Sequence, residues 1–267
     1  MRLMDYHVHS LHSFDGEQTI DAMCASMLRA GVAECCLTEH YDQGYADPKL
    51  NTPPVWDVWL KEIAGARERH PELILRAGVE IGDVPAYRET MRRTVDALPL
   101  DFRLLSLHQV DGIDPWDSKR FFAGRDRAEA YRAYARAVAD AAEAWEDYDS
   151  MAHVGYLGRY APWPDKALQW RDAPDELDRL LRRLAQTGRC LEVNTSGADV
   201  LGGPIPHPSI IRRFLELGGE CFTLGSDAHR ENRDGDGLRD AQALLLSLGA
   251  RWQAGFEQRK RKVWKLG

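Results

Sequence analysis

Three features common in other protein classes are missing from this 267-residue chain. It has no apolar run near the ~20 residues that a transmembrane helix needs, and its first residues carry a single Arg2 but no apolar segment typical of a secretory signal. Its five cysteines form no Cys-x-x-Cys pair and are too few and too scattered for a disulfide framework. Acidic residues outnumber basic ones by 42 to 35, which disfavours a general binder of nucleic acid or anionic membranes. We therefore expect a cytoplasmic protein with no nucleic-acid partner and no membrane partner.

What is present is an alternation of short apolar runs with longer amphipathic segments, the pattern of repeated βα units and a parallel sheet. The predicted strands are 3–9, 34–38, 73–81, 102–107, 150–153, 190–194 and 220–225, and the predicted helices are 19–30, 54–69, 84–97, 125–147, 174–187, 207–217 and 238–248. No interdomain linker interrupts the series, so we expect one α/β domain over residues 1–267. The irregular stretches 41–52 and 155–172 are expected to form walls of a site, and the basic run 259–265 a solvated terminal face.

Acids and histidines gather at the carboxyl ends of these predicted strands. In a parallel α/β barrel the carboxyl ends of the strands meet at one mouth, where such proteins place their active sites. Residues i and i+2 of a strand share a face, so His7 with His9, and Asp227 with His229, each offer two side chains to one site. The residues in question are His7, His9, Glu39, His40, Glu80, His108, His153, Asp227 and His229.

Two interpretations account for the histidines and acids at these strand ends. Each histidine could be a hydrogen-bonded core residue that tethers a loop. Burying so many imidazoles and carboxylates together without cations would, however, cost several kcal/mol for each uncompensated ion. Imidazole and carboxylate are ligands for borderline divalent metals such as zinc, manganese or iron. We therefore predict a site for two to three divalent ions.

Seven stretches carry a resemblance to a known family. They are "DYHVHSLHSFDG", "CLTEHYD", "GVEIG", "SLHQVDG", "AHVGYLGRY", "LEVNTSG" and "TLGSDAH", and they run from residue 5 to 229. Their order and spacing resemble the PHP (polymerase and histidinol phosphatase) family of metal-dependent phosphoesterases, in its histidinol-phosphatase branch. The resemblance implies a distorted (β/α)7 TIM-like barrel, which agrees with the seven predicted strands.

The resemblance also implies a ligand set for up to three metal ions. Glu80 would bridge two of the ions, and His12 is an alternative ligand for the third, because many family members have a histidine where Asp15 stands. The first ion would be held by His7, His9, Glu80 and Asp227, the second by Glu80, His108 and His153, and the third by Asp15, His40 and His229.

Five further residues are predicted around the substrate. The resemblance to the family's Arg-Tyr pair makes Arg159 a candidate phosphate ligand, since a guanidinium fork suits two phosphate oxygens. Glu192 and Asn194 share a face of the sixth strand and are expected either to bind substrate polar groups or to support the metal ligands. His12 is a candidate for the phosphate, and His207 for the entrance.

Phosphate monoester hydrolysis at such a cluster needs no protein nucleophile. A divalent ion lowers the pKa of bound water towards ~7, so the expected nucleophile is a metal-bound hydroxide, with Asp227, Glu80 and His229 as supporting residues. Metal-bound water, His12 and Glu39 remain open as general acids for the leaving alkoxide.

Three functions are compatible with these residues. The first is hydrolysis of L-histidinol phosphate to L-histidinol and phosphate in histidine biosynthesis. The second is the same chemistry on another small phosphomonoester, such as a nucleotide or sugar phosphate. The third is a metal-stabilised module without turnover. We favour the first, with a small-molecule phosphomonoester as the partner and the oligomeric state left open.

Overall fold

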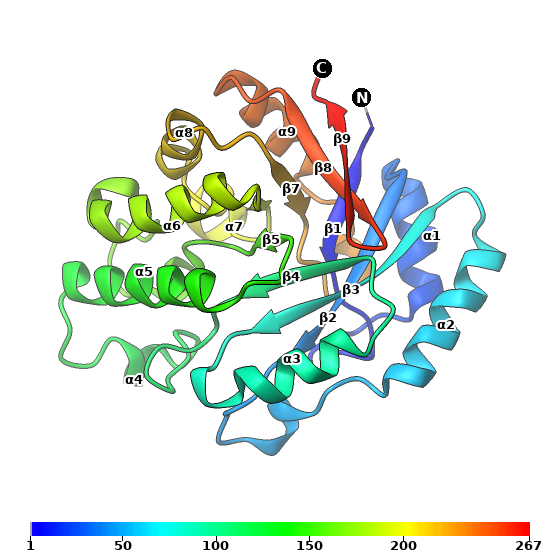
Figure 1. Cartoon of the computed structure of the whole chain (residues 1–267), viewed down its shortest axis with the longest axis horizontal. Coiled ribbons are helices and arrows are strands. Elements are labelled where there is room, and N and C mark those ends of the chain that lie inside the picture. The colour runs from blue at the N-terminus through cyan, green and yellow to red at the C-terminus, as the bar shows by residue number, and fades with distance from the viewer. Residues whose placement is uncertain (1) are drawn as a thin grey trace.

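The computed structural model describes residues 2–267 and shows seven parallel strands with helices between them. Each strand pairs with its neighbour in the chain, and all six pairings are parallel. The long helices lie around the outside of the strands (Figure 1). The seven strands are β1 Met4–Val8, β2 Glu34–Tyr41, β3 Ile74–Gly82, β4 Phe102–Ser106, β5 Ser150–Met151, β6 Cys190–Asn194 and β7 Phe222–Gly225.

The described helices cover all seven predicted helical segments. Two short ones, α4 and α7, lie in segments that carried no helical prediction. The helices are α1 Ile20–Ala30, α2 Trp56–Arg69, α3 Arg88–Asp96, α4 Ser118–Phe121, α5 Arg127–Ala144, α6 Pro174–Thr187, α7 Ala198–Leu201, α8 Pro208–Glu216 and α9 Leu238–Ser247. Single 3₁₀ turns are η1 Pro48–Asn51, η2 Pro85–Tyr87, η3 Tyr156–Tyr160, η4 Trp170–Asp172 and η5 Glu231–Arg233. No helix among residues 2–267 has the length and hydropathy of a transmembrane span.

The first and last strands of the series approach each other and nearly close the barrel. The Asp227 backbone N–H donates to the His7 carbonyl at 2.7 Å, and the His9 N–H donates to the Ala228 carbonyl at 2.9 Å. The predicted distorted (β/α)7 TIM-like barrel in a single domain is therefore confirmed. The closing bonds join the segments that carry four predicted metal ligands, so barrel closure itself brings those ligands together.

A β-bulge in β1 decides which of its side chains face the interior. The register against β2 shifts by one residue between Asp5 and Val8, and such an extra residue reverses the alternation of faces. Tyr6 can therefore pack in the apolar floor of the barrel while the adjacent His7 faces Glu80 at the mouth. Strict alternation along this strand would have sent one of the two outward.

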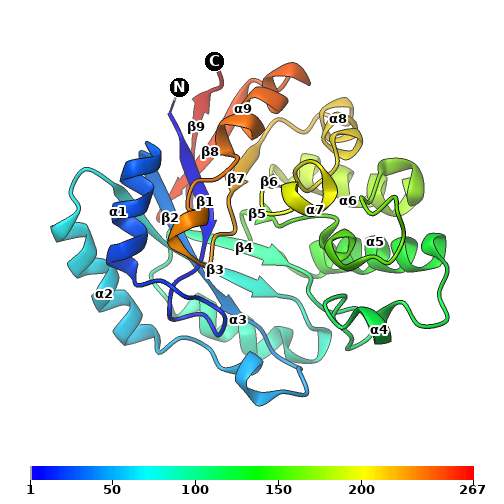
Figure 2. The same cartoon turned by 180° about the vertical axis from the view of Figure 1, so that it is seen from behind.

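The floor of the barrel is covered by a C-terminal hairpin that the sequence analysis did not predict. It consists of β8 Trp252–Glu257 and β9 Lys260–Lys265, paired antiparallel. Its Phe256 packs in one apolar cluster with Tyr6 and Phe102, and the Phe256 N–H donates to the Tyr6 hydroxyl at 2.6 Å. The hairpin lies beside β1, so the two ends of the described chain are close together in both views (Figures 1 and 2).

The interpretation of 259–265 as a solvated terminal face was therefore incomplete. Most of β9 is exposed, but Trp264 is half-buried and packs against the floor cluster. Arg259 forms ion pairs with Asp149 at 2.6 Å and Asp147 at 2.8 Å. Arg259 thus anchors the hairpin to the barrel. All five cysteines are free and buried, as expected for small apolar core residues.

Candidate metal centre

Each predicted metal ligand lies at or just beyond the carboxyl end of a strand. His7 is in β1, His40 in β2 and Glu80 in β3, while the others follow β1, β4, β5 and β7. Because the strands are parallel, these ends share one rim. The rim opens into a cavity of about 410 Å³ that seven of the predicted ligands line, namely Asp15, His40, Glu80, His108, His153, Asp227 and His229. His7 and His9 are fully buried beneath it.

Four of these ligand atoms form a compact cage. The Nε2 atoms of His7 and His9 lie 3.3 and 3.6 Å from Glu80 Oε2, and each lies 3.5 Å from Asp227 Oδ1. Ligands bonded to one tetrahedral ion at about 2.1 Å stand about 3.4 Å apart. The spacing therefore suits one divalent ion held by these four residues.

The other oxygen of Glu80 faces a second group. Its Oε1 lies 2.8 Å from His153 Nε2 and 3.2 Å from His108 Nε2. The two imidazole nitrogens are themselves 3.4 Å apart. A single glutamate thus presents Oε1 to one ligand group and Oε2 to another, and Oε2 also lies 2.9 Å from His40 Nδ1. A carboxylate that bridges two ions has this arrangement.

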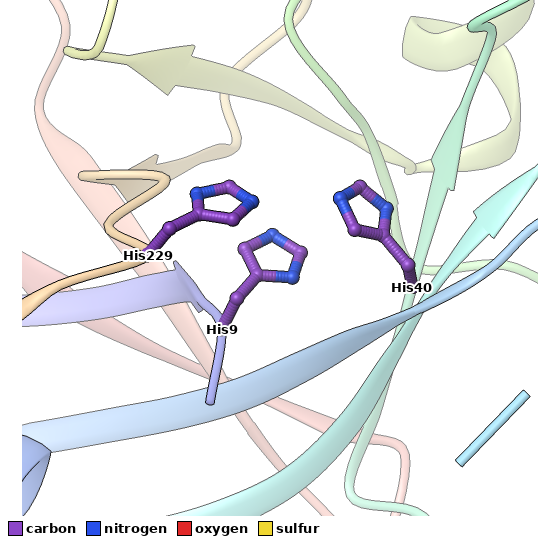
Figure 3. Close-up of side chains that lie close together, drawn as sticks. All are labelled: His9, His40 and His229. Carbon is purple, nitrogen blue, oxygen red and sulfur yellow. The ribbon is translucent and has the colours of Figure 1, made fainter. Parts of the chain in front are cut away.

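A third group lies on the opposite side of His9. The rings of His9, His40 and His229 converge on a common space (Figure 3). Asp15 reaches the same space, with carboxylate oxygens 3.6 Å from His40 Nε2 and 3.2 Å from His229 Nε2. His9 stacks on His229 with ring centroids 4.1 Å apart. His9 therefore borders both the first and the third group.

The cluster contains buried polar atoms that have no hydrogen-bond partner in the described chain. Within residues 2–267, the buried atoms without a hydrogen-bond partner include His7 Nε2, His9 Nε2, Glu80 Oε2, His229 Nε2 and Asp42 Oδ2. Leaving such atoms unpaired costs about 1–3 kcal/mol each. These nitrogen and oxygen donors suit zinc, manganese or iron. The residues present therefore fit the divalent metal ions that the ligand pattern implies.

The pKa shifts in the cluster are also compatible with bound cations. Burial lowers the pKa of His7, but the carboxylates around it, led by Glu192, raise that pKa well above its usual value. The pKa of His9 falls to about 3 because of burial and then the neighbouring His229 imidazole. Burial raises the pKa of Glu80, but the surrounding imidazoles, led by His7, bring it well below the usual range. Imidazolium protons thus balance the buried carboxylates here, and bound cations can take over that role.

A set of hydrogen bonds fixes the orientation of the ligand histidines. Glu192 Oε1 lies 2.6 Å from His7 Nδ1, and the other oxygen of Glu192 accepts the His153 backbone N–H at 2.7 Å. Carboxylates of this kind hold a histidine ring in place and raise its basicity as a ligand. Of the two interpretations considered for Glu192, the geometry favours support of the ligands over contact with substrate.

Two further supports were not singled out from the sequence. Asp42, just beyond the end of β2, accepts from His108 Nδ1 at 2.8 Å. Ser13 Oγ lies 3.0 Å from His9 Nδ1 and donates to Glu39 at 2.6 Å. The i, i+2 spacing from His40 was the available signal for Asp42. Glu39 is occupied by these structural contacts, which weighs against its use as a general acid.

Arg159 lines the same cavity on the 3₁₀ turn that follows β5. Its Nη2 donates to Asp227 Oδ2 at 2.6 Å and to Asn194 Oδ1 at 3.3 Å. The guanidinium lies over the Tyr156 ring, 5.4 Å from its centroid. Asn194 therefore supports Arg159 from below, and Arg159 presents its charge beside the predicted ligands.

His12 and His207 make local contacts outside the cavity. His12 Nε2 pairs with Glu62 at 2.9 Å on helix α2. His207 begins α8, and its Nδ1 accepts the Ser209 backbone N–H at 3.1 Å. One ring nitrogen of each residue is engaged in a local contact and neither residue lines the cavity, so their substrate roles stay predictions.

Comparisons with known proteins show the family to which the chain belongs. The family model for the PHP domain matches residues 5–196. The histidinol-phosphatase of Lactococcus lactis is 30% identical over 263 residues, covering 97% of this chain and 96% of that protein. A crystal structure of the histidinol phosphate phosphatase from Lactococcus lactis, complexed with zinc, L-histidinol and phosphate, superimposes with a TM-score of 0.90 at 27% identity. That match covers 98% of this chain and 99% of the other. With a ligand cage at the strand ends and a family match over most of its length, the chain belongs to the PHP domain family.

Proposed function

We propose that this protein hydrolyses L-histidinol phosphate to L-histidinol and phosphate with the help of divalent metal ions. The observation that carries the proposal is the cage at the barrel mouth, in which Glu80 presents one oxygen to each of two ligand groups beside Arg159. The full-length similarity to a Lactococcus lactis enzyme crystallised with zinc, L-histidinol and phosphate supports the same substrate.

The residues that would hold the ions are those of the three groups. Bound divalent ions supply an activated water at neutral pH and neutralise charge on the phosphate. The first group is His7, His9, Glu80 and Asp227, the second is Glu80, His108 and His153, and the third is Asp15, His40 and His229.

Residues of the chain itself bind the phosphate and orient the metal ligands. Arg159 binds the phosphate oxygens and holds the scissile bond against the cage, since its planar fork matches two oxygens at once. Glu192, Asp42 and Ser13 keep three ligand rings from rotating. Preorganised ligands of this kind need no rearrangement when the reaction begins.

The cavity and the charge pattern indicate the kind of partner. A volume of about 410 Å³ suits a small molecule. The net charge of −7 disfavours nucleic acid as a substrate, and an enzyme of amino-acid biosynthesis belongs in the cytoplasm. We therefore propose a cytoplasmic enzyme acting on a small phosphomonoester.

The test is phosphate release by the purified protein loaded with zinc, manganese or iron. We expect kcat/KM for L-histidinol phosphate to exceed that for a nucleotide and a sugar phosphate by at least about tenfold, or ~1.4 kcal/mol. Asp227→Asn should lose at least about 100-fold, whereas Asp236→Asn, an exposed acid on the same segment, should retain activity. Equal turnover of all three esters would refute the substrate, and no phosphate release with any metal would refute the enzyme.

A further inference from the structure

One carboxylate in the cavity belongs to none of the metal-ligand groups. Asp114 lies on the loop between β4 and α4 and lines the cavity with Tyr45 and Tyr156. It accepts the Tyr45 hydroxyl at 2.6 Å, the Tyr156 hydroxyl at 3.2 Å and the Trp116 backbone N–H at 2.8 Å. These three donors together engage both carboxylate oxygens of Asp114.

These contacts leave Asp114 with unused capacity for a cation. An ionised carboxylate accepts about four hydrogen bonds, and Asp114 receives three, of which Oδ2 receives only that of Tyr45. Within residues 2–267 it has no ion-pair partner, whereas Asp111 on the same loop pairs with Arg125 at 3.6 Å. Burial raises the pKa of Tyr45 and Tyr156 far above the usual value, so both hydroxyls remain neutral donors. The negative charge of Asp114 is therefore uncompensated.

Tyr156 connects Asp114 to the metal centre. The Tyr156 ring lies 5.3 Å from both the His108 and the His153 rings, and its hydroxyl reaches Asp114. Arg159 lies over the same ring at 5.4 Å. The cavity thus has a cationic end for phosphate and, one tyrosine away, an anionic end. The cavity therefore suits a small molecule that carries an anionic group at one end and a cationic group at the other.

We propose that Asp114 selects substrates by binding a protonated nitrogen at the end of the molecule remote from the phosphate. The inference rests on the proposed function and specifies its substrate class as phosphomonoesters that carry a cation. Tyr45 and Trp116 also line the cavity, and aromatic rings add attraction for a cation. An ammonium and an imidazolium share this chemistry, and near neutral pH the amine of L-histidinol is mainly protonated whereas its imidazole is protonated only in part.

The test compares a cationic with a neutral substrate in the zinc-loaded enzyme. For Asp114→Asn we expect kcat/KM for L-histidinol phosphate to fall by about 10- to 100-fold, mostly through KM, because a charge-assisted hydrogen bond is lost. Turnover of phenyl phosphate should change by less than about threefold. The matched control is Asp111→Asn, which removes an acid of the same loop outside the cavity and should leave both substrates unaffected.

A binding measurement separates this inference from the proposed function. L-histidinol should bind the zinc-loaded protein at least about tenfold more weakly in Asp114→Asn than in wild type, as measured by calorimetry. That result supports the inference even if wild type fails to hydrolyse L-histidinol phosphate. Unchanged L-histidinol binding in Asp114→Asn would overturn the inference, and so would an equal loss of activity on both substrates, which would reveal a purely structural role for this side chain.

Discussion

Replacing Glu192 by glutamine removes a negative charge while keeping the shape of the side chain. We expect this variant to bind metal more weakly. Glu192 is 1% exposed. One of its oxygens faces His7 Nδ1 at 2.6 Å, and the other accepts the His153 backbone N–H at 2.7 Å. A glutamine amide has only one oxygen, so its NH₂ group must face one of these two donors. The carboxylate that now raises the basicity of His7 would also be lost.

Two effects of different size follow from this geometry. Mutating carboxylates that orient a ligand histidine lowers metal affinity about 10- to 100-fold, which corresponds to about 1.4–2.7 kcal/mol. The donor facing the amide is left unsatisfied in the interior, which lowers the free energy of unfolding by a further ~1–3 kcal/mol. The two losses are measured separately, the first by zinc titration against a competing chelator and the second by urea unfolding of the zinc-free protein.

The matched control is a buried glutamate that touches no ligand. Glu34 is also 1% exposed, but it accepts from Tyr6 at 2.6 Å and Arg76 at 3.1 Å near the floor of the barrel. Glu34→Gln should lower stability and leave zinc affinity within about twofold. Unchanged zinc affinity in Glu192→Gln, or an equal change in the two variants, would refute the argument that Glu192 acts through His7.

Three further outcomes are expected. Gly82→Ala places a Cβ atom 1.8 Å from Asp42 Oδ1, so it should displace the contact between Asp42 and His108 and lower the zinc content measured by elemental analysis; wild-type zinc content would contradict this. Burial raises the pKa of Asp234 to about 7. Between about pH 4 and 7 this carboxyl is therefore protonated in the folded state and ionised in the unfolded state, so unfolding releases a proton. The free energy of unfolding should fall by up to about 1.4 kcal/mol per pH unit as pH rises through that window. Asp234→Asn, which keeps an acceptor for Gln18, should remove this contribution to the slope in urea unfolding, and an unchanged slope would show that Asp234 does not contribute to it. Chelation should lower the melting temperature and restored zinc should raise it again with zinc concentration, whereas a melting temperature insensitive to chelator would mean that no ion is bound in the folded state.

The sequence was sufficient for the order of the strands and for which ends carry the ligands. Apolar runs of the right length predicted all seven barrel strands, because fully buried parallel strands have a strong local signature. Strand order and parallel direction together placed the ligands on one rim, whereas their division into three groups was implied by the resemblance to the PHP family. The direction in which the His7 side chain points depends on a bulge in β1. No local sequence pattern predicted that bulge.

The parts that escaped prediction depend on contacts between distant segments. The basic composition of 259–265 gave no sign of strand β9. The apolar side of the hairpin is carried by Phe256 and its neighbours in β8, which lie outside that run. Glu192 could not be assigned from its face alone, because the same strand position can serve a substrate or a ligand ring. Asp114 sits in an irregular loop, and its role follows only once Tyr45 and Tyr156 are seen to meet it.

The most direct test of the account is anomalous diffraction at the zinc absorption edge from crystals of the zinc-replete protein. We expect two or three peaks at the barrel mouth, one of them about 2.0–2.2 Å from His7 Nε2 and Asp227 Oδ1 and another at the same distance from His153 Nε2. Glu80 should lie between these two peaks. A zinc-replete crystal with no peak among these side chains would contradict the metal centre and, with it, the proposed hydrolysis.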